Sequence, residues 1–298
     1  MSRNTLFRLV VFFLGIPLLA ASAFIGRNHG LPIFGILVVG ASALAAREAA
    51  FFFPSSLRDY PGSTVIIPLM GTLIPTVGYV SSLTTHWDHG SAIGASAIVV
   101  PTFMVAASLI MAVQVVKRID HEIDLIVPVV TSHLFILIYP GLFTWHAARL
   151  VSFEYNSELL LLFFLSVYLN DSLAWLFGRL LGPITRRRDG APPVAISPNK
   201  SIVGFVAGFL TSIAVIVLAG IVRPEVLPGP TILHAVFGAI IGSASIVGDL
   251  VESGFKRSAA VKDSGQLIPG RGGLLDSIDS AVFVAPFFFY GCVILYGI

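Results

Sequence analysis

The chain has 298 residues, of which 56% are hydrophobic and only 11% are charged. Soluble globular proteins carry about 25% charged residues, so this much apolar surface cannot be buried in a water-soluble core. The composition therefore excludes a soluble enzyme and indicates a membrane protein with several spanning helices. The single cysteine, Cys292, excludes an internal disulfide and a cysteine-based metal site.

Nine apolar stretches are long enough to cross a bilayer, at about 17–25 residues each. The sequence predicts an all-α, polytopic helical bundle with spans at 6–26, 31–53, 64–84, 92–116, 125–146, 157–181, 201–222, 231–253 and 278–297. We expect one integrated membrane domain, with an N-terminal bundle over residues 1–150 and a C-terminal catalytic region over residues 151–298. Ala21 and Ala23 resemble a signal cleavage site, but the many later spans favour a retained first helix.

The basic residues predict the orientation of these spans. With the N-terminus in the cytosol, only Arg27, Arg149 and Arg223 of the 18 Lys and Arg residues fall on the external side. Such an asymmetry follows the positive-inside rule. We therefore expect an integral protein of the bacterial cytoplasmic (inner) membrane, with its chemistry at the cytosolic face, where nucleotides and Mg²⁺ are found.

Asp171 lies inside the predicted span 157–181, with Arg179 two turns further on. A carboxylate in a spanning helix costs a few kcal/mol and normally faces the bundle interior or a water-filled cavity. A structural polar cluster is the alternative. We favour a functional role for Asp171, because ionisable groups inside membranes are mostly functional.

The segment from Gly248 to Ser280 concentrates charge in an otherwise apolar chain. Asp249, Glu252 and Lys256 are spaced to share one helix face, although an ordinary polar helix end would look the same. Asp276 and Asp279 open the last span, where they could also cap the helix. Carboxylates at this density, mixed with basic residues, predict a hard cation such as Mg²⁺ and a phosphate-bearing ligand.

Two further features could contact phosphate groups. Gly272 and Gly273 would let backbone N–H groups approach an anion, with Arg271 adding charge, although most such sequences are simple turns. Ser197 and Lys200 precede the span 201–222, and Lys200 at its mouth is the better candidate for a phosphate contact.

These residues resemble the signature of the phosphatidate cytidylyltransferase (CDP-diacylglycerol synthase) family, S-x-x-K-R-x4-K-D-x-G-x4-P-G-H-G-G-x-x-D-R-x-D. The matching positions are Ser253, Lys256, Arg257, Lys262, Asp263, Gly265, Pro269, Gly270, Gly272, Gly273, Asp276 and Asp279. Asn170, Asp171, Gly178 and Arg179 resemble a second family block, and Ser197, Pro198, Lys200 and Ser201 resemble a third. The resemblance covers residues 170–280, whereas the first half matches only in hydropathy.

The resemblance implies cytidylyl transfer from CTP to phosphatidate, giving CDP-diacylglycerol and pyrophosphate. It implies catalytic roles for Asp263, Lys262, Lys256, Arg257 and Arg271. Substrate contacts would come from Asp171, Arg179, Ser197, Lys200, Ser253, Gly272 and Gly273. Asp249, Asp263, Asp276 and Asp279 would hold Mg²⁺, with a second cation left open. The expected partners are CTP, phosphatidate or a related lipid phosphate, and membrane lipids, with no nucleic acid; a homodimer is left open.

Three departures from the family pattern keep other functions open. Arg271 stands at the family's histidine, Ser277 at its arginine and Val203 at its glutamate. One alternative is therefore a CTP-dependent transferase for another lipid phosphate or a polyprenol. An inactive lipid-binding relative is another. An ion-coupled transporter using Asp171 is less favoured, because the acids cluster towards one end of the chain and no repeat is visible.

Overall fold

The computed structural model describes residues 21–25, 31–60, 62–84, 91–118, 122–182, 194–198, 200–268 and 272–297. These residues form helices and turns without a β-strand, apart from an isolated bridge between Ile268 and Gly272. The predicted all-α class is thus confirmed for the described residues. The predicted first span, 6–26, falls mostly outside them.

Within the described residues, eight helical stretches are long and apolar enough to cross a membrane, and they match the second to ninth predicted spans. The chain order is α3 (Pro32–Ala49), η3 (Ala50–Phe52), α4 (Ser55–Arg58), α5 (Ser63–Thr84), α6 (Ser91–Arg118), η4 (Ile123–Leu125), α7 (Ile126–Ile136), η5 (Leu137–Phe143), α8 (Thr144–Arg149), η6 (Leu150–Ser152), α9 (Asn156–Leu181), α10 (Ile202–Val222), α11 (Thr231–Ser258) and α12 (Leu275–Tyr296). The fifth predicted span is one continuous run from η4 to η6 that contains a π-helical segment, η5, with Pro140 inside it.

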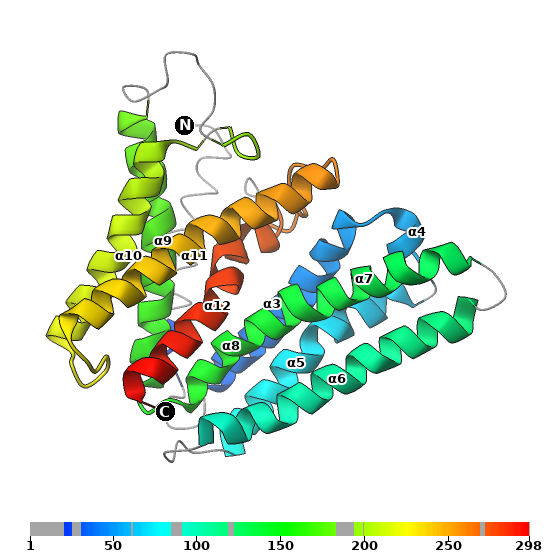
Figure 1. The fold of residues 1–298 in the computed structure, drawn as a ribbon, viewed down its shortest axis with the longest axis horizontal. Helices are drawn as coiled ribbons and strands as arrows, with labels where there is room; N and C mark the ends of the chain where they lie inside the picture. Colours follow the sequence, from blue (N-terminus) through cyan, green and yellow to red (C-terminus); the bar gives the residue numbers. More distant parts are fainter. Residues whose placement is uncertain are drawn as a thin grey trace.

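Helices α9 and α10 form an antiparallel pair that is inclined to the other long helices (Figure 1). Their backbones approach closely because small residues face the partner helix, as is common in membrane bundles. A Cβ built on Gly204 would lie 2.6 Å from the carbonyl oxygen of Ala174. This close pairing brings the C-terminal half of α9 beside the start of α10. Helix α12 packs against α11, α8, α9 and α3, so both halves of the chain contribute to one bundle.

The two helices that flank the predicted polar loop are longer than hydropathy predicts. Helix α11 runs to Ser258, five residues past the predicted end at 253, and α12 starts at Leu275, three residues before the predicted start at 278. Lys256 and Arg257 occupy the last turn of α11, where cations interact favourably with the carbonyl end of a helix. A hydropathy criterion counts such residues as loop, so it shortened both helices.

The C-terminus of α11 ends in a left-handed residue that is not glycine. Ala260 has φ 55°, and the N–H groups of Ala260 and Val261 donate to the carbonyls of Arg257 and Lys256, respectively. This is the hydrogen-bond pattern in which glycine is preferred, because a Cβ costs about 1–2 kcal/mol in the left-handed region. We therefore expect Ala260→Gly to stabilise the protein by about 1 kcal/mol. A lower apparent Tm for this variant in thermal unfolding in detergent would contradict the assignment.

Candidate active site

A cavity of about 500 Å³ lies where the C-terminal half of α9, the start of α10, the C-terminal half of α11 and the start of α12 meet. Small-molecule sites typically enclose about 300–1,000 Å³, so the volume suits a nucleotide-sized ligand. Its walls are formed by Asn170, Asp171, Ala174, Trp175, Gly178, Arg179, Lys200, Ser201, Gly204, Phe205, Ile246, Asp249, Asp276 and Asp279. Residues from four helices therefore share one cavity.

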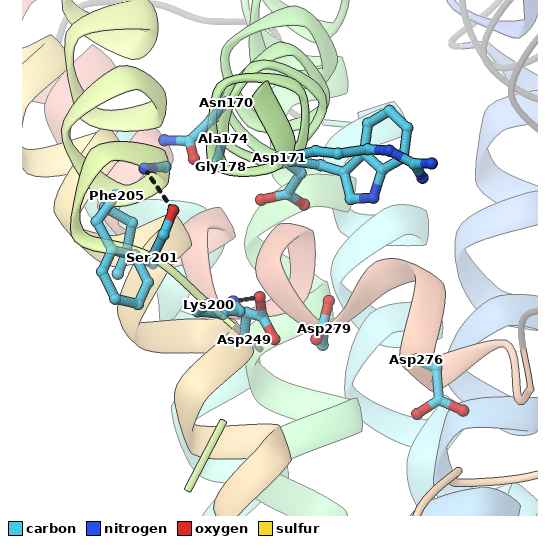
Figure 2. Close-up of a pocket in the computed structure, with 14 residues that line it drawn as sticks. Asn170, Asp171, Ala174, Gly178, Lys200, Ser201, Phe205, Asp249, Asp276 and Asp279 are labelled. Atoms are coloured by element: carbon cyan, nitrogen blue, oxygen red, sulfur yellow. Dashed lines mark hydrogen bonds and ion pairs between the residues drawn. The ribbon is translucent and has the colours of Figure 1, made fainter. Parts of the chain in front are cut away.

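Three aspartates from three helices line the cavity together with Lys200. Figure 2 shows Asp249 of α11 directly beside Lys200, Asp279 of α12 on the other side of Asp249, and Asp171 of α9 above them. Lys200 forms an ion pair with Asp249. The Ser245 hydroxyl donates to Asp171 Oδ1 at 3.4 Å, and the Ser280 N–H donates to Asp279 Oδ1 at 2.7 Å. The structure thus places these three aspartates, which are far apart in the sequence, in the lining of one cavity.

Lys200 precedes α10, and its neighbour Ser201 caps that helix by accepting a hydrogen bond from the Gly204 N–H at 3.1 Å. Burial lowers the pKa of the Lys200 ammonium below its usual value, while the carboxylates of Asp171 and Asp279 oppose that shift. The α10 N-cap thus fixes the backbone next to a cation that is surrounded by carboxylates. A cation held in this way can exchange a carboxylate for a phosphate of similar charge.

Asp276 lies to one side of this group and is held by the protein itself (Figure 2). Its Oδ1 accepts a hydrogen bond from Lys256 Nζ at 2.5 Å. Its Oδ2 accepts from the N–H groups of Ser264 at 2.9 Å and Gly273 at 2.7 Å. Lys256 also pairs with Glu252, whose side chain is fully buried. Lys256 therefore links the end of α11 to the start of α12 at the cavity edge.

Gly272 separates Asp276 from Asp263. It has φ 114°, and a Cβ built on it would lie 2.5 Å from Asp276 Oδ2 and 3.1 Å from the Cβ of Asp263. A residue with a side chain would be strained by both the backbone conformation and the contact. Position 272 therefore requires glycine, because Asp276 and Asp263 already fill the space that a Cβ would occupy.

The structure brings six of the predicted site residues to the cavity and leaves others outside its lining. The lining residues are Asp171, Arg179, Lys200, Asp249, Asp276 and Asp279. The predicted residues that do not line it are Ser197, Ser253, Lys256, Arg257, Lys262, Asp263, Gly272 and Gly273. Of these, Arg257, Lys262 and Asp263 are exposed. Arg271 lies outside the described residues.

Sequence reasoning did not select Glu48, which belongs to α3 and contacts the segment before α12. Its carboxylate accepts hydrogen bonds from the N–H groups of Leu274 at 2.9 Å and Leu275 at 2.7 Å. The signal was available, because Glu48 is an acid in the predicted span 31–53, and the rule applied to Asp171 applies to it as well. Two aromatic residues of the cavity wall, Trp175 and Phe205, also went unpredicted. Nothing in the sequence distinguishes them from aromatic residues that face lipid.

The oxygen-rich walls suit a hard cation. Among the residues that the structure describes, no three His, Cys, Asp or Glu side chains are close enough to form a metal cage by themselves. Mg²⁺ usually binds one or two carboxylates and takes its remaining oxygens from substrate phosphates and water. One or two of the cavity carboxylates would therefore suffice for a magnesium ion that arrives with a nucleotide.

The fold and the site define a polytopic membrane protein with a charged, nucleotide-sized cavity at one end of its bundle. Comparison with known families is more specific: the model of the Cytidylyltransferase family matches residues 6–295. The chain belongs to this family.

Individual relatives match the chain over a shorter segment. A phosphatidate cytidylyltransferase of Staphylococcus haemolyticus (strain JCSC1435) is 45% identical over 124 residues, which cover 41% of this chain and 44% of the relative. That of Staphylococcus aureus (strain COL) is 43% identical over 129 residues, which cover 41% of this chain and 44% of the relative. The uncharacterized protein YnbB of Escherichia coli (strain K12) is 41% identical over 136 residues, covering 45% of this chain and 43% of the relative. Each match thus spans less than half of the relative's length.

Proposed function

We propose that the protein transfers the cytidylyl group of CTP to phosphatidate, giving CDP-diacylglycerol and pyrophosphate with the help of Mg²⁺. The observation that carries the proposal is that Asp171, Asp249 and Asp279, from three helices, line one cavity with Lys200. The family match supports the use of CTP, and the staphylococcal relatives support phosphatidate as the acceptor.

The charges of the cavity explain why a divalent cation is needed. Among the residues that the structure describes, four aspartates line it, together with two cations, Arg179 and Lys200. A triphosphate would be repelled by walls with more acids than bases unless a cation bridged them. Mg²⁺ would neutralise phosphate charge, and Asp249 and Asp279 are the side chains that would hold it, with Asp171 beside them.

In the proposed reaction, an oxygen of the phosphatidate phosphate attacks the α-phosphorus of CTP. A new P–O bond forms, the bond between the α-phosphorus and the bridging oxygen to the β-phosphorus breaks, and pyrophosphate leaves with that electron pair. The attacking oxygen is already anionic, so no strong general base is required. The work of the protein is to align the two phosphates and to balance negative charge.

Lys200 is the residue that we assign to the triphosphate. In the structure its charge is paired with Asp249. A bound nucleotide would replace Asp249 as the partner of Lys200, which would free the Asp249 carboxylate for the cation. Arg179 is exposed near the end of α9 and lines the cavity, and in this proposal it would meet the phosphate of a lipid that enters from the bilayer. Its guanidinium lies 5.5 Å from the Trp175 ring centroid, and Trp175 is 62% exposed.

The direct test is an assay of the purified protein in lipid micelles with labelled CTP. We expect pyrophosphate release and a labelled lipid product only when CTP, phosphatidate and Mg²⁺ are all present. Lack of turnover with every lipid acceptor, while CTP still binds, would favour an inactive lipid-binding relative instead.

A different lipid acceptor is the second candidate function. It is favoured by Ser277 and Val203, which stand where the resembling family has arginine and glutamate, and by the similarity to YnbB, whose substrate is not stated. A panel of phosphatidate, polyprenyl phosphate and other lipid phosphates separates the two candidates. Turnover of CTP with one of the others, and none with phosphatidate, would replace the first assignment by the second.

A further inference from the structure

Glu48 is a buried carboxylate that joins the first half of the chain to the start of α12. Its side chain belongs to the last turn of α3, and the residue is 7% exposed. Oε1 accepts a hydrogen bond from the Leu274 N–H at 2.9 Å, and Oε2 accepts from the Leu275 N–H at 2.7 Å and from the Ser264 hydroxyl at 3.1 Å. These donors include two N–H groups at the α12 N-terminus that have no partner within the helix. A negative charge also interacts favourably with that end of the helix.

Two glycines leave room for this carboxylate. A Cβ built on Gly265 would lie 2.6 Å from Glu48 Oε1, and one built on Gly273 would lie 2.4 Å from Glu48 Oε2. Real Cβ atoms do not approach other atoms so closely, so both positions require glycine while Glu48 keeps its place. The sequence analysis interpreted Gly273 as a phosphate contact. In the structure, the space next to it is filled by the Glu48 carboxylate.

The Glu48 contacts continue to the cavity through Ser264. The Asp276 N–H lies 3.3 Å from the Ser264 hydroxyl, and the Ser264 N–H donates to Asp276 Oδ2 at 2.9 Å. Asp276 in turn lines the cavity and accepts a hydrogen bond from Lys256. Glu48 is not among the described residues that line the cavity, yet its hydrogen bonds hold the backbone next to Asp276 and the start of the helix that carries Asp279.

We propose that Glu48 is a positioning residue for the cytidylyl transfer, and that it acts by holding the segments 259–268 and 272–274 against α3. The inference rests on the proposed function, because Asp279, which α12 carries, is one of the carboxylates assigned to the cation. Glutamine cannot replace Glu48. In either orientation its amide –NH₂ faces the N–H of Leu274 or Leu275, so one of these donors loses its acceptor.

The test compares Glu48→Gln with the wild type in two independent measurements. Kinetics should show kcat lowered by about 10²-fold, since small displacements of positioned groups have effects of that size. The Mg²⁺ concentration for half-maximal rate should rise, while KM for the lipid acceptor stays unchanged. Hydrogen exchange at the amides of Leu274 and Leu275 should become about tenfold faster without nucleotide, because their acceptor is weakened.

The matched control is Ser42→Ala, which removes another buried polar group of α3. The Ser42 hydroxyl lies 2.7 Å from the Gly71 carbonyl oxygen and 2.5 Å from that of Pro140, away from the segment before α12. This variant should lower the apparent Tm without changing the Mg²⁺ dependence or the exchange of Leu274 and Leu275. If Ser42→Ala reproduces the kinetic changes of Glu48→Gln, the effect is general destabilisation and the proposal is wrong.

Ser264→Ala keeps the proposal testable if Glu48→Gln does not fold, because it removes only one of the three donors to Glu48. It should shift kcat and amide exchange in the same direction by a smaller factor. If Glu48→Gln has both the kinetics and the amide hydrogen exchange of the wild type, the positioning role is wrong. The proposed function is not affected by that result. A wild-type protein without CTP-dependent turnover defeats the proposed function, whereas the exchange experiment still decides whether Glu48 holds the segment.

Discussion

Replacing Asp249 by asparagine should lower kcat/KM for CTP by about 10²–10³-fold, which corresponds to the several kcal/mol that a bound metal ion supplies in charge stabilisation. Asp249 lines the cavity and forms the ion pair with Lys200. The substitution keeps the size of the side chain and removes its charge, so a cation bridging the phosphates loses an oxygen ligand. The measurement is incorporation of labelled CTP into lipid by the purified variant, over a range of Mg²⁺ concentrations.

Asp59→Asn is the matched control for this experiment. Asp59 follows the short helix α4, its side chain is 65% exposed, and it forms an ion pair with its neighbour Arg58. The same chemical change there should leave kcat/KM for CTP unchanged. Asp249→Asn with wild-type activity at every Mg²⁺ concentration would show that Asp249 does not serve the cation.

The second large effect is expected for Lys200→Met, which removes the ammonium but keeps an unbranched apolar side chain. Loss of one partner from a half-buried charged pair typically costs about 2–5 kcal/mol in binding. We expect KM for CTP to rise by about 10²-fold, because Lys200 is the cavity cation assigned to the triphosphate. Steady-state kinetics with CTP as the varied substrate measures this change.

The double variant Lys200→Met with Asp249→Asn separates a catalytic pair from a structural one. Each single variant leaves the other group without its partner, so both singles should have a lower apparent Tm than the double. If the pair only stabilises the fold, the double variant should regain activity along with stability. We expect it to regain stability and to stay inactive, because both the nucleotide contact and the cation ligand are gone.

Much of the fold followed from the sequence, because a spanning helix is specified by a long apolar run alone. The structure has helices at all eight predicted spans that it describes. The ends of α11 and α12 were less predictable. Lys256 and Asp276 are polar, yet they lie inside these helices because each finds the other as a partner and because their charges suit the helix ends. Hydropathy does not contain that information.

The candidate site could be predicted in part, and its limits have a physical cause. The position of Asp171 in an apolar helix marked it as a candidate, since a buried charge is costly without a role. Asp249 was marked by its spacing with Glu252 and Lys256 in the charge-rich segment 248–280. Which acids face the cavity depends on helix rotation, and spacing alone did not separate Asp279, which lines the cavity, from Asp263, which is exposed beside Gly272. The positioning role proposed for Glu48 could not be inferred from the sequence. It depends on a contact between α3 and the residues before α12, which are more than 200 residues apart in the sequence.

The central claim is that aspartates from α9, α11 and α12 hold a nucleoside triphosphate through a divalent cation. Equilibrium binding of labelled CTP to the purified protein, with Mg²⁺ and with a chelator, tests it without relying on turnover. We predict saturable CTP binding that requires Mg²⁺. Because Asp279 lines the cavity, the affinity should be strongly weakened in Asp279→Asn. Binding of equal affinity in the presence of the chelator, or an unchanged affinity in Asp279→Asn, would contradict the account.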